Sequence, residues 1–153
     1  MSNKQTILII DDEVQIRKIL RITLEANDYR VIEAESGKDG ITKAAMHQPN
    51  AIFLDLGLPD DDGLNILKQL REWYKHPIVI LSVRNSEKDI IMALDFGADD
   101  YLTKPFNMGE LLARLRTAFR HIQPTENISV FKVNDIVVDF ANRVVKKGED
   151  ELK

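Results

Sequence analysis

Short apolar runs alternate with stretches whose apolar residues recur at helical spacing through the first 122 residues. The runs predict strands at residues 6–10, 30–33, 51–55, 78–82 and 101–103. The run at 78–81 is apolar throughout, which is typical of a strand covered on both faces. Strands that alternate with amphipathic helices favour βαβ units and a parallel sheet.

The stretches between the runs predict helices, with spacings of three and four between apolar residues. Ser36 is a candidate N-cap of the second helix, and residues 48–50 end that helix. Trp73 on the third helix is expected to be a packing residue rather than a site residue. The simplest solution for five β/α repeats is an α/β fold, a flavodoxin-like doubly wound parallel sheet of strand order 2-1-3-4-5. Three of the helices are predicted from Val14, Ile16, Ile19, Leu20 and Leu24; from Leu64, Ile66, Leu67 and Leu70; and from Leu111, Leu112, Leu115, Phe119 and Ile122.

The pattern changes after residue 122. Residues 123–129 contain Pro124 and predict a linker, because the residue before a proline disfavours helix. Residues 136–140 and 144–147 predict the strands of an antiparallel hairpin. A lone hairpin is marginally stable in water, so residues 130–153 are interpreted as the truncated start of a second domain.

Composition excludes several classes of function. The chain has no cysteine, which excludes a disulfide framework, and its three histidines lack metal-ligand spacing. A net charge of −4 gives no basic surface for nucleic acid. With neither a signal peptide nor a long apolar span, we expect a cytoplasmic protein that does not contact a membrane.

Four charged residues stand where predicted strands end. Asp11 and Asp12 follow the first strand, Asp55 ends the third and Lys104 follows the fifth. Because the carboxyl ends of parallel strands open onto one crevice, these side chains are expected to converge. Three carboxylates form a site for a hard cation, beside a lysine able to meet a phosphoryl group.

The blocks that carry these residues resemble the receiver domain of two-component response regulators, which assigns residues 1–122 to a receiver. They occur in the family's order and spacing. The block at residues 97–101 and the predicted hairpin resemble the OmpR/PhoB class, whose members are winged-helix transcription factors. Within that class, the block at residues 54–59 followed by Asp60 resembles the Kdp-type regulators of potassium transport. The blocks are Leu8-Ile9-Ile10-Asp11-Asp12-Glu13, Leu54-Asp55-Leu56-Gly57-Leu58-Pro59, Ile80-Leu81-Ser82 and Gly97-Ala98-Asp99-Asp100-Tyr101-Leu102-Thr103-Lys104-Pro105-Phe106.

The resemblance implies a role for each residue of the constellation. Asp55 would accept a phosphoryl group from the phosphohistidine of a sensor histidine kinase. Asp12 and Asp55 would ligate Mg²⁺ directly and Asp11 through water, with the backbone oxygen of Gly57 as a further ligand. Lys104 would contact a phosphoryl oxygen.

Ser82 would also contact the phosphoryl group, and Ser82 and Tyr101 would act as the switch. The resemblance further implies a cis peptide bond before Pro105. Such a protein is a stoichiometric phosphoacceptor with weak autophosphatase activity at most, so we do not expect an enzyme.

The resemblance also implies a homodimer through the face formed by the fourth helix, fifth strand and fifth helix. Asp100 and Arg114 match an intersubunit charge pair, and Glu110 matches one member of another. The expected basic partner of Glu110 is replaced by Ile90, and Lys88 is offset by two residues. DNA would be bound only through the missing C-terminal domain.

Some of these residues also have simpler structural interpretations. The acidic turn at Asp11 and Asp12 is equally consistent with a helix cap, and residues 60–62 are interpreted as a solvated loop. Alternative functions are a receiver-like interaction module that takes no phosphate and, less favoured, an aspartyl-phosphate phosphatase, which needs an Asp-x-Asp nucleophile on the first strand. A flavodoxin is least favoured, because no phosphate-binding loop follows that strand.

Overall fold

The computed structural model describes residues 4–122, in which five strands and five helices alternate. The strands are β1 (Thr6–Ile10), β2 (Arg30–Ala34), β3 (Ala51–Leu54), β4 (Ile78–Ser82) and β5 (Asp100–Thr103). The helices are α1 (Val14–Ala26), α2 (Gly37–His47), α3 (Gly63–Arg71), α4 (Glu87–Asp95) and α5 (Met108–Ile122). Each predicted strand is present, with ends that differ by at most one residue.

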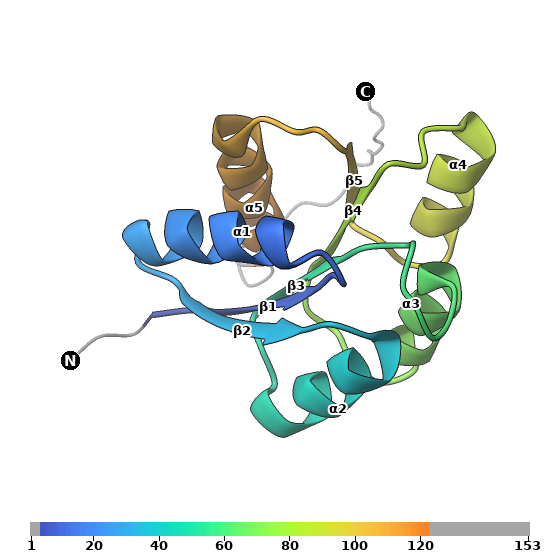
Figure 1. Ribbon diagram of the computed structural model, residues 1–153, viewed down its shortest axis with the longest axis horizontal. Coiled ribbons are helices and arrows are strands. Elements are labelled where there is room, and N and C mark those ends of the chain that lie inside the picture. Colours follow the sequence, from blue (N-terminus) through green and yellow to red (C-terminus); the bar gives the residue numbers. More distant parts are fainter. Residues whose placement is uncertain (1–3, 123–153) are drawn as a thin grey trace, which may run out of the picture. The chain divides into compact units, whose positions relative to one another are not determined.

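The five strands form one parallel sheet of order β2-β1-β3-β4-β5. Helices α1 and α5 lie on one face of the sheet, and α2, α3 and α4 lie on the other (Figure 1). The predicted fold class and strand order are therefore confirmed. This order places the carboxyl ends of β1 and β3 side by side, which brings their following residues together.

The core fills both faces of the sheet because successive strand residues point in opposite directions. In β1, Leu8 and Ile10 belong to the cluster that includes the buried residues of α2, α3 and α4. Ile7 and Ile9 are equally buried and point to the face that carries α1 and α5. The apolar run at β4 is likewise buried throughout, as the sequence pattern predicted.

Helix ends follow local chemistry. Ser36 caps α2, since its side chain accepts a hydrogen bond of 3.1 Å from the Asp39 N–H, which confirms the predicted cap. Gly97 has φ 113 and ends the segment after α4 in a conformation that a side chain would strain. The placement of Trp73 on the third helix is wrong, because Trp73 lies beyond the end of α3 and is 41% exposed; its ring packs edge-on against that of Tyr74, with 6.0 Å between the ring centroids. Its neighbour Tyr74 is buried instead and donates a hydrogen bond of 2.9 Å to the Pro49 carbonyl.

Arg71, the last residue of α3, ties together the loops at the amino edge of β4 and β5. Its Nε donates to the Gly97 carbonyl at 2.8 Å, and its Nη1 donates to the carbonyls of Tyr74 and His76 at 2.9 and 2.8 Å. Its Nη2 lies 2.8 Å from the Asp99 carboxylate, which also accepts from the first N–H of β4. One guanidinium thus connects three chain segments at the edge of the sheet away from Asp55.

Contacts group the chain up to Arg116 into one compact unit, whose boundary falls within α5. The predicted linker at 123–129 and the predicted hairpin at 130–153 lie outside the described residues. Within residues 4–122, none of the helices is long and apolar enough to cross a membrane.

Candidate functional site

The three aspartates meet at the carboxyl edge of the central strands. Hydrogen bonds that continue the sheet beyond the strand ends hold the backbone there: Asp11 N–H donates to the Ala34 carbonyl at 3.0 Å, and Asp55 N–H donates to the Ile10 carbonyl at 2.9 Å. One carboxylate oxygen from each of Asp11, Asp12 and Asp55 lies within 4.8 Å of the others. The structure therefore brings together the residues that the strand-end pattern predicted to converge.

The three carboxylates differ in environment. Asp11 and Asp55 are buried, whereas Asp12 is exposed. Burial raises the pKa of Asp11, although the Glu13 N–H at 2.9 Å and Lys104 partly oppose this rise. Removing a carboxylate from water disfavours its charged form, so the site gains from any cation that enters it.

Lys104 places a positively charged ammonium group beside these carboxylates. Its backbone N–H donates to the Ser82 carbonyl at 2.8 Å, and its Nζ lies 2.9 Å from Asp11 Oδ2, 3.0 Å from Glu13 Oε1 and 3.5 Å from Asp55 Oδ2. Burial alone would lower the pKa of Lys104, but the carboxylates around it outweigh burial and raise the pKa. The bond between Lys104 and Pro105 is cis.

The donor set fits a hard divalent cation. It consists of carboxylate oxygens from two neighbouring strand ends, and one of the three groups faces solvent. Mg²⁺ binds through a few carboxylates and keeps several waters, so an open acidic site of this kind suits it. Gly57 adjoins the group, because its N–H donates to Asp55 Oδ1 at 3.3 Å.

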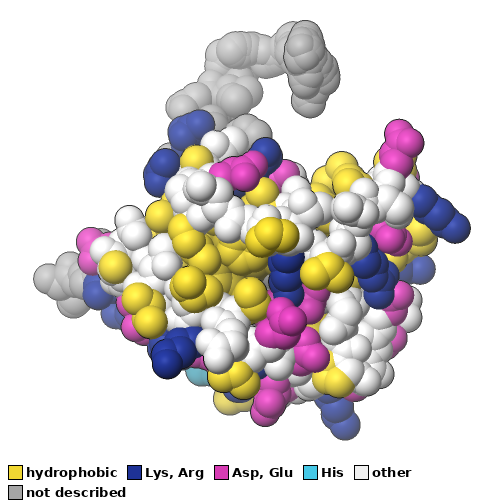
Figure 2. All heavy atoms as spheres, turned by 45° about the horizontal axis from the view of Figure 1, so that its top comes forward, with side chains coloured by type: hydrophobic (Ala, Val, Ile, Leu, Met, Phe, Trp, Pro, Cys, Tyr) yellow, Lys and Arg dark blue, Asp and Glu magenta, His cyan; other side chains and the backbone are white. Residues whose placement is uncertain are grey.

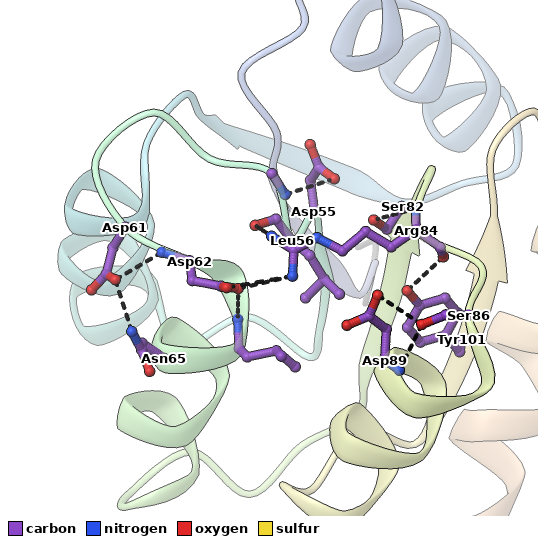
Figure 3. Close-up of polar contacts among 12 residues, drawn as sticks. Asp55, Leu56, Asp61, Asp62, Asn65, Ser82, Arg84, Ser86, Asp89 and Tyr101 are labelled. Atoms are coloured by element: carbon purple, nitrogen blue, oxygen red, sulfur yellow. Dashed lines mark hydrogen bonds and ion pairs between the residues drawn. The ribbon is translucent and has the colours of Figure 1, made fainter.

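Ser82 and Tyr101 meet at the start of the β4–α4 loop through Arg84 (Figure 3). The buried Ser82 hydroxyl accepts from the Arg84 N–H at 3.1 Å, and the Tyr101 hydroxyl donates to the Arg84 carbonyl at 2.7 Å. The Arg84 guanidinium crosses to the β3–α3 loop, where it lies 3.3 Å from Asp62 and 3.4 Å from the Leu56 carbonyl. The sequence analysis missed Arg84, because its contacts depend on the folded positions of two loops.

Residues 60–62 lie in the loop between β3 and α3 and are exposed or half-buried, as the interpretation of a solvated loop expected, but two of their carboxylates have defined partners. Asp62 caps α3 by accepting from the Leu64 N–H at 3.0 Å. Asp60 accepts from the backbone N–H groups of Gly37 and Lys38, at the start of α2. Asp62 stands directly before a helical pattern, so cap preference could have identified it. Asp60 bonds to a distant segment and gives no local signal.

The residues predicted for a dimer face lie together within one chain. Arg114 is 3.0 Å from Asp100 and 3.0 Å from Glu110. Lys88 is exposed on α4, and Ile90 is partly buried. The role of these residues between subunits stays a prediction.

Apolar side chains are exposed beside the acidic site. Val14 follows the acidic turn and is 63% exposed, and Val83 follows Ser82 and is 70% exposed. Figure 2 shows hydrophobic side chains next to a group of acidic and basic ones on the face that it presents.

A family comparison agrees with this geometry. Residues 7–116 match the model of the response regulator receiver domain. The chain belongs to this family. The receiver's match covers the three aspartates, Ser82, Tyr101 and Lys104, and the family identification confirms the resemblance on which their expected roles depend.

The receiver is similar to transcriptional regulators. It is 49% identical over 147 residues to the KDP operon transcriptional regulatory protein KdpE of Escherichia coli, covering 95% of this chain and 65% of that protein. It is 44% identical to the transcriptional regulatory protein KdpE of Mycobacterium tuberculosis, covering 94% of this chain and 65% of that protein. The chain thus spans slightly less than two thirds of the length of these relatives.

Solved structures show the same fold. The BeF3-activated N-terminal receiver domain of Klebsiella pneumoniae RstA has a TM-score of 0.73 at 30% identity, with 75% of this chain and 98% of that chain covered. A two-component response regulator from Clostridium difficile has a TM-score of 0.77 at 32% identity, with 78% and 99% covered.

Proposed function

We propose that this receiver accepts a phosphoryl group on Asp55 from the phosphohistidine of a sensor histidine kinase and thereby controls a transcription factor. The observation that carries the proposal is the surroundings of Asp55. Oxygens of Asp11 and Asp12 lie within 4.8 Å of an Asp55 oxygen, and the Lys104 ammonium lies 3.5 Å from Asp55 Oδ2. The similarity to KdpE proteins supports the link to transcription.

Transfer would proceed by direct attack of the Asp55 carboxylate on phosphorus. The new O–P bond forms as the P–N bond to the donor imidazole breaks, and the electron pair of that bond returns to the imidazole nitrogen. Asp11, Asp12, Asp55 and the Gly57 carbonyl would hold Mg²⁺, with Asp11 acting through water. Bound there, Mg²⁺ supplies positive charge that offsets the negative charge of the transferring phosphoryl group.

Lys104 would exchange partners during the reaction. In the structure its ammonium serves the carboxylates of Asp11, Glu13 and Asp55. A cation that enters the acidic site takes over part of this role, so Lys104 becomes available to a phosphoryl oxygen. The exposed apolar residues Val14 and Val83 favour a protein as the phosphoryl donor, since they offer it contact area beside the site.

The switch would start at the Ser82 hydroxyl. When this hydroxyl donates to a phosphoryl oxygen, the hydrogen bond that it accepts from the Arg84 N–H changes. The carbonyl of the same residue, Arg84, accepts the hydrogen bond from the Tyr101 hydroxyl. The local change would thereby reach β5 and the face of α4, β5 and α5. There, Arg114 would exchange its contacts with Asp100 and Glu110 for contacts across a C2 dimer.

The remaining assignments extend this proposal to the longer protein. Residues 123–129 would form a linker and residues 130–153 the start of a winged-helix domain, through which the whole protein would bind DNA. The receiver would act as a stoichiometric acceptor rather than an enzyme, because one phosphoryl group modifies one Asp55 and leaves only by slow hydrolysis.

Labelling with acetyl phosphate and Mg²⁺ tests the acceptor, with intact-protein mass spectrometry as the readout. We expect one phosphoryl group on the wild-type protein and none on Asp55→Asn. Asp61→Asn is the matched control: Asp61 lies in the next loop and its Oδ1 accepts from Asp62 N–H and from Asn65, which an amide oxygen also permits. Equal labelling of wild type and Asp55→Asn would refute the assignment, and absence of labelling would favour the interaction module.

Two further measurements test the rest of the proposal. Sedimentation of the labelled protein should show dimers, and Tyr101→Ala should weaken this response; an unchanged response would refute the switch. Incubation with phosphomonoesters should give no sustained turnover, since repeated turnover would indicate the phosphatase instead.

A further inference from the structure

Asp60 connects the loop that follows the phosphoacceptor to a different helix. This loop runs from Leu56 to Asp62, between β3 and α3. The two oxygens of the Asp60 carboxylate accept hydrogen bonds from the first two residues of α2: Oδ1 from Gly37 N–H at 2.8 Å and Oδ2 from Lys38 N–H at 2.9 Å. Both groups are among the N–H groups that a helix start leaves without an internal partner.

The contact is electrostatically favourable. The hydrogen bonds from Lys38 and Gly37 lower the pKa of Asp60, so the carboxylate is ionised at neutral pH. A negative charge at a helix N-terminus also interacts well with the helix dipole. Helix α2 has a separate cap, however, because the Ser36 side chain accepts from the Asp39 N–H. The hydrogen bonds of Asp60 therefore add a connection between the loop and α2 that the helix cap does not provide.

The start of α2 is shaped for this contact. A Cβ on Gly37 would lie 2.5 Å from Ile66 Cδ1 and 3.3 Å from Asp60 Oδ1. The glycine thus allows α2 to approach both α3 and the Asp60 carboxylate. The cleft between α2 and α3 is lined by Asp60, by the neighbouring Asp61 and by Lys38.

The loop that Asp60 connects to α2 also contains Gly57, and side-chain packing does not fix the position of Gly57. Gly57 is exposed, and a Cβ built on it would meet no atom within 4 Å. Its position depends on hydrogen bonds instead. At the base of the loop, Gly57 forms an antiparallel bridge with Asp62, and Gly63 N–H donates to the Leu56 carbonyl at 2.8 Å. At the turn of the loop, Asp60 fixes the chain to α2.

We propose that Asp60 is a positioning residue for the metal site. By binding the loop to α2, it holds the Gly57 carbonyl oxygen where that oxygen can complete the site formed by Asp11, Asp12 and Asp55. The inference deepens the proposed function and rests on it, because it assumes that these residues bind Mg²⁺. Loss of the Asp60 contact leaves all three carboxylates in place, so binding should weaken rather than disappear.

Mg²⁺ titration of the whole chain by calorimetry tests this role, with Ser36→Ala as the matched control. Ser36→Ala removes a cap from the same helix start without touching the loop, so it should lower Tm and leave the Mg²⁺ Kd unchanged. Asp60→Ala should raise the Kd at least threefold, and Asp60→Asn, which keeps one acceptor oxygen, should fall between Asp60→Ala and wild type.

Acetyl phosphate labelling of the same variants separates positioning from damage to the fold. A positioning defect should slow labelling of Asp60→Ala at limiting Mg²⁺ and disappear at saturating Mg²⁺. An unchanged Kd in Asp60→Ala, or an equal rise in Ser36→Ala, would overturn the role of Asp60. Failure of the wild-type protein to bind Mg²⁺ would instead refute the proposed function, and the positioning role with it.

Discussion

Replacing Lys104 with methionine removes the positive charge that pairs with the buried carboxylates of Asp11 and Asp55. The side chain of Lys104 is 8% exposed, and those of its partners Asp11 and Asp55 are 2% and 8% exposed. Methionine retains most of the side-chain volume, so the substitution tests charge more than packing. Both aspartates would be left without their cation in surroundings that already raise the pKa of Asp11.

Breaking a buried ion pair by removing one partner costs about 3–5 kcal/mol. The exposed Glu13 at 3.0 Å adds little to this sum, because solvent screens its charge. Protonation of Asp11 in the variant relieves part of the cost, so we expect Lys104→Met to lose about 3 kcal/mol of unfolding free energy at pH 7. For a domain of this size the corresponding fall in Tm is about 10 °C.

Urea unfolding in EDTA measures the loss of unfolding free energy in Lys104→Met. A double-mutant cycle with Asp11→Asn shows how much of this loss comes from the ion pair between Lys104 and Asp11. Because the second substitution removes the uncompensated charge, Lys104→Met with Asp11→Asn should recover at least half of the lost stability. Mg²⁺ should also stabilise Lys104→Met more than it stabilises wild type, since a dication replaces the missing charge. A loss below about 1 kcal/mol, or a double variant as unstable as the single one, would refute this account of the site.

Four further substitutions test other parts of the fold by urea unfolding. A Cβ on Gly63 would overlap the Leu56 Cα of the preceding loop, so Gly63→Ala should cost about 1–3 kcal/mol. Gly57→Ala, where nothing lies within 4 Å, should be nearly neutral, and equal effects of the two substitutions would contradict the steric argument. Tyr74→Phe removes a buried hydrogen bond of 2.9 Å to the Pro49 carbonyl and should cost about 1–3 kcal/mol, and an unchanged midpoint would show that the carbonyl finds another donor. Burial alone would raise the pKa of Glu33, but hydrogen bonds from Arg21 and Arg17 of α1 lower this pKa below its ordinary value of 4.5. The ion pairs therefore stabilise the folded protein fully above pH 4.5, and this stabilisation is lost as the pH falls through the lower pKa of the folded state. Glu33→Gln should therefore flatten the acid side of the stability profile, and a profile identical to that of wild type would be evidence against the ion pairs.

The sequence predicted the sheet well because burial on both faces of a central strand leaves a clear signal. The wholly apolar run at β4 and the alternation with helical stretches determined the fold class and strand order. The convergence of Asp11, Asp55 and Lys104 followed from one rule of parallel sheets, without any knowledge of side-chain contacts.

What the sequence did not reveal depends on contacts between segments that are distant in the chain. Asp60 bonds to the start of α2 and Arg84 reaches the β3–α3 loop, and neither contact follows from a local period or cap preference. The placement of Trp73 on the third helix was wrong for a related reason: α3 ends before Trp73, and the buried position in this segment belongs to Tyr74. The roles of Asp100, Arg114 and Glu110 between subunits cannot be read from one chain, where these residues pair with each other.

Arg71 has a consequence for where this molecule can move. Its guanidinium donates to four acceptors from the segments before β4 and β5, so a shift of either segment away from Arg71 breaks at least one short hydrogen bond. At the opposite edge, Arg84 holds its partners at 3.3 to 3.4 Å through contacts that are partly exposed. The Arg71 guanidinium therefore holds the segments before β4 and β5 through shorter hydrogen bonds than those of the Arg84 guanidinium at the carboxyl edge. Separating the β3–α3 loop from Arg84 would therefore break weaker hydrogen bonds than separating Arg71 from the segments before β4 and β5.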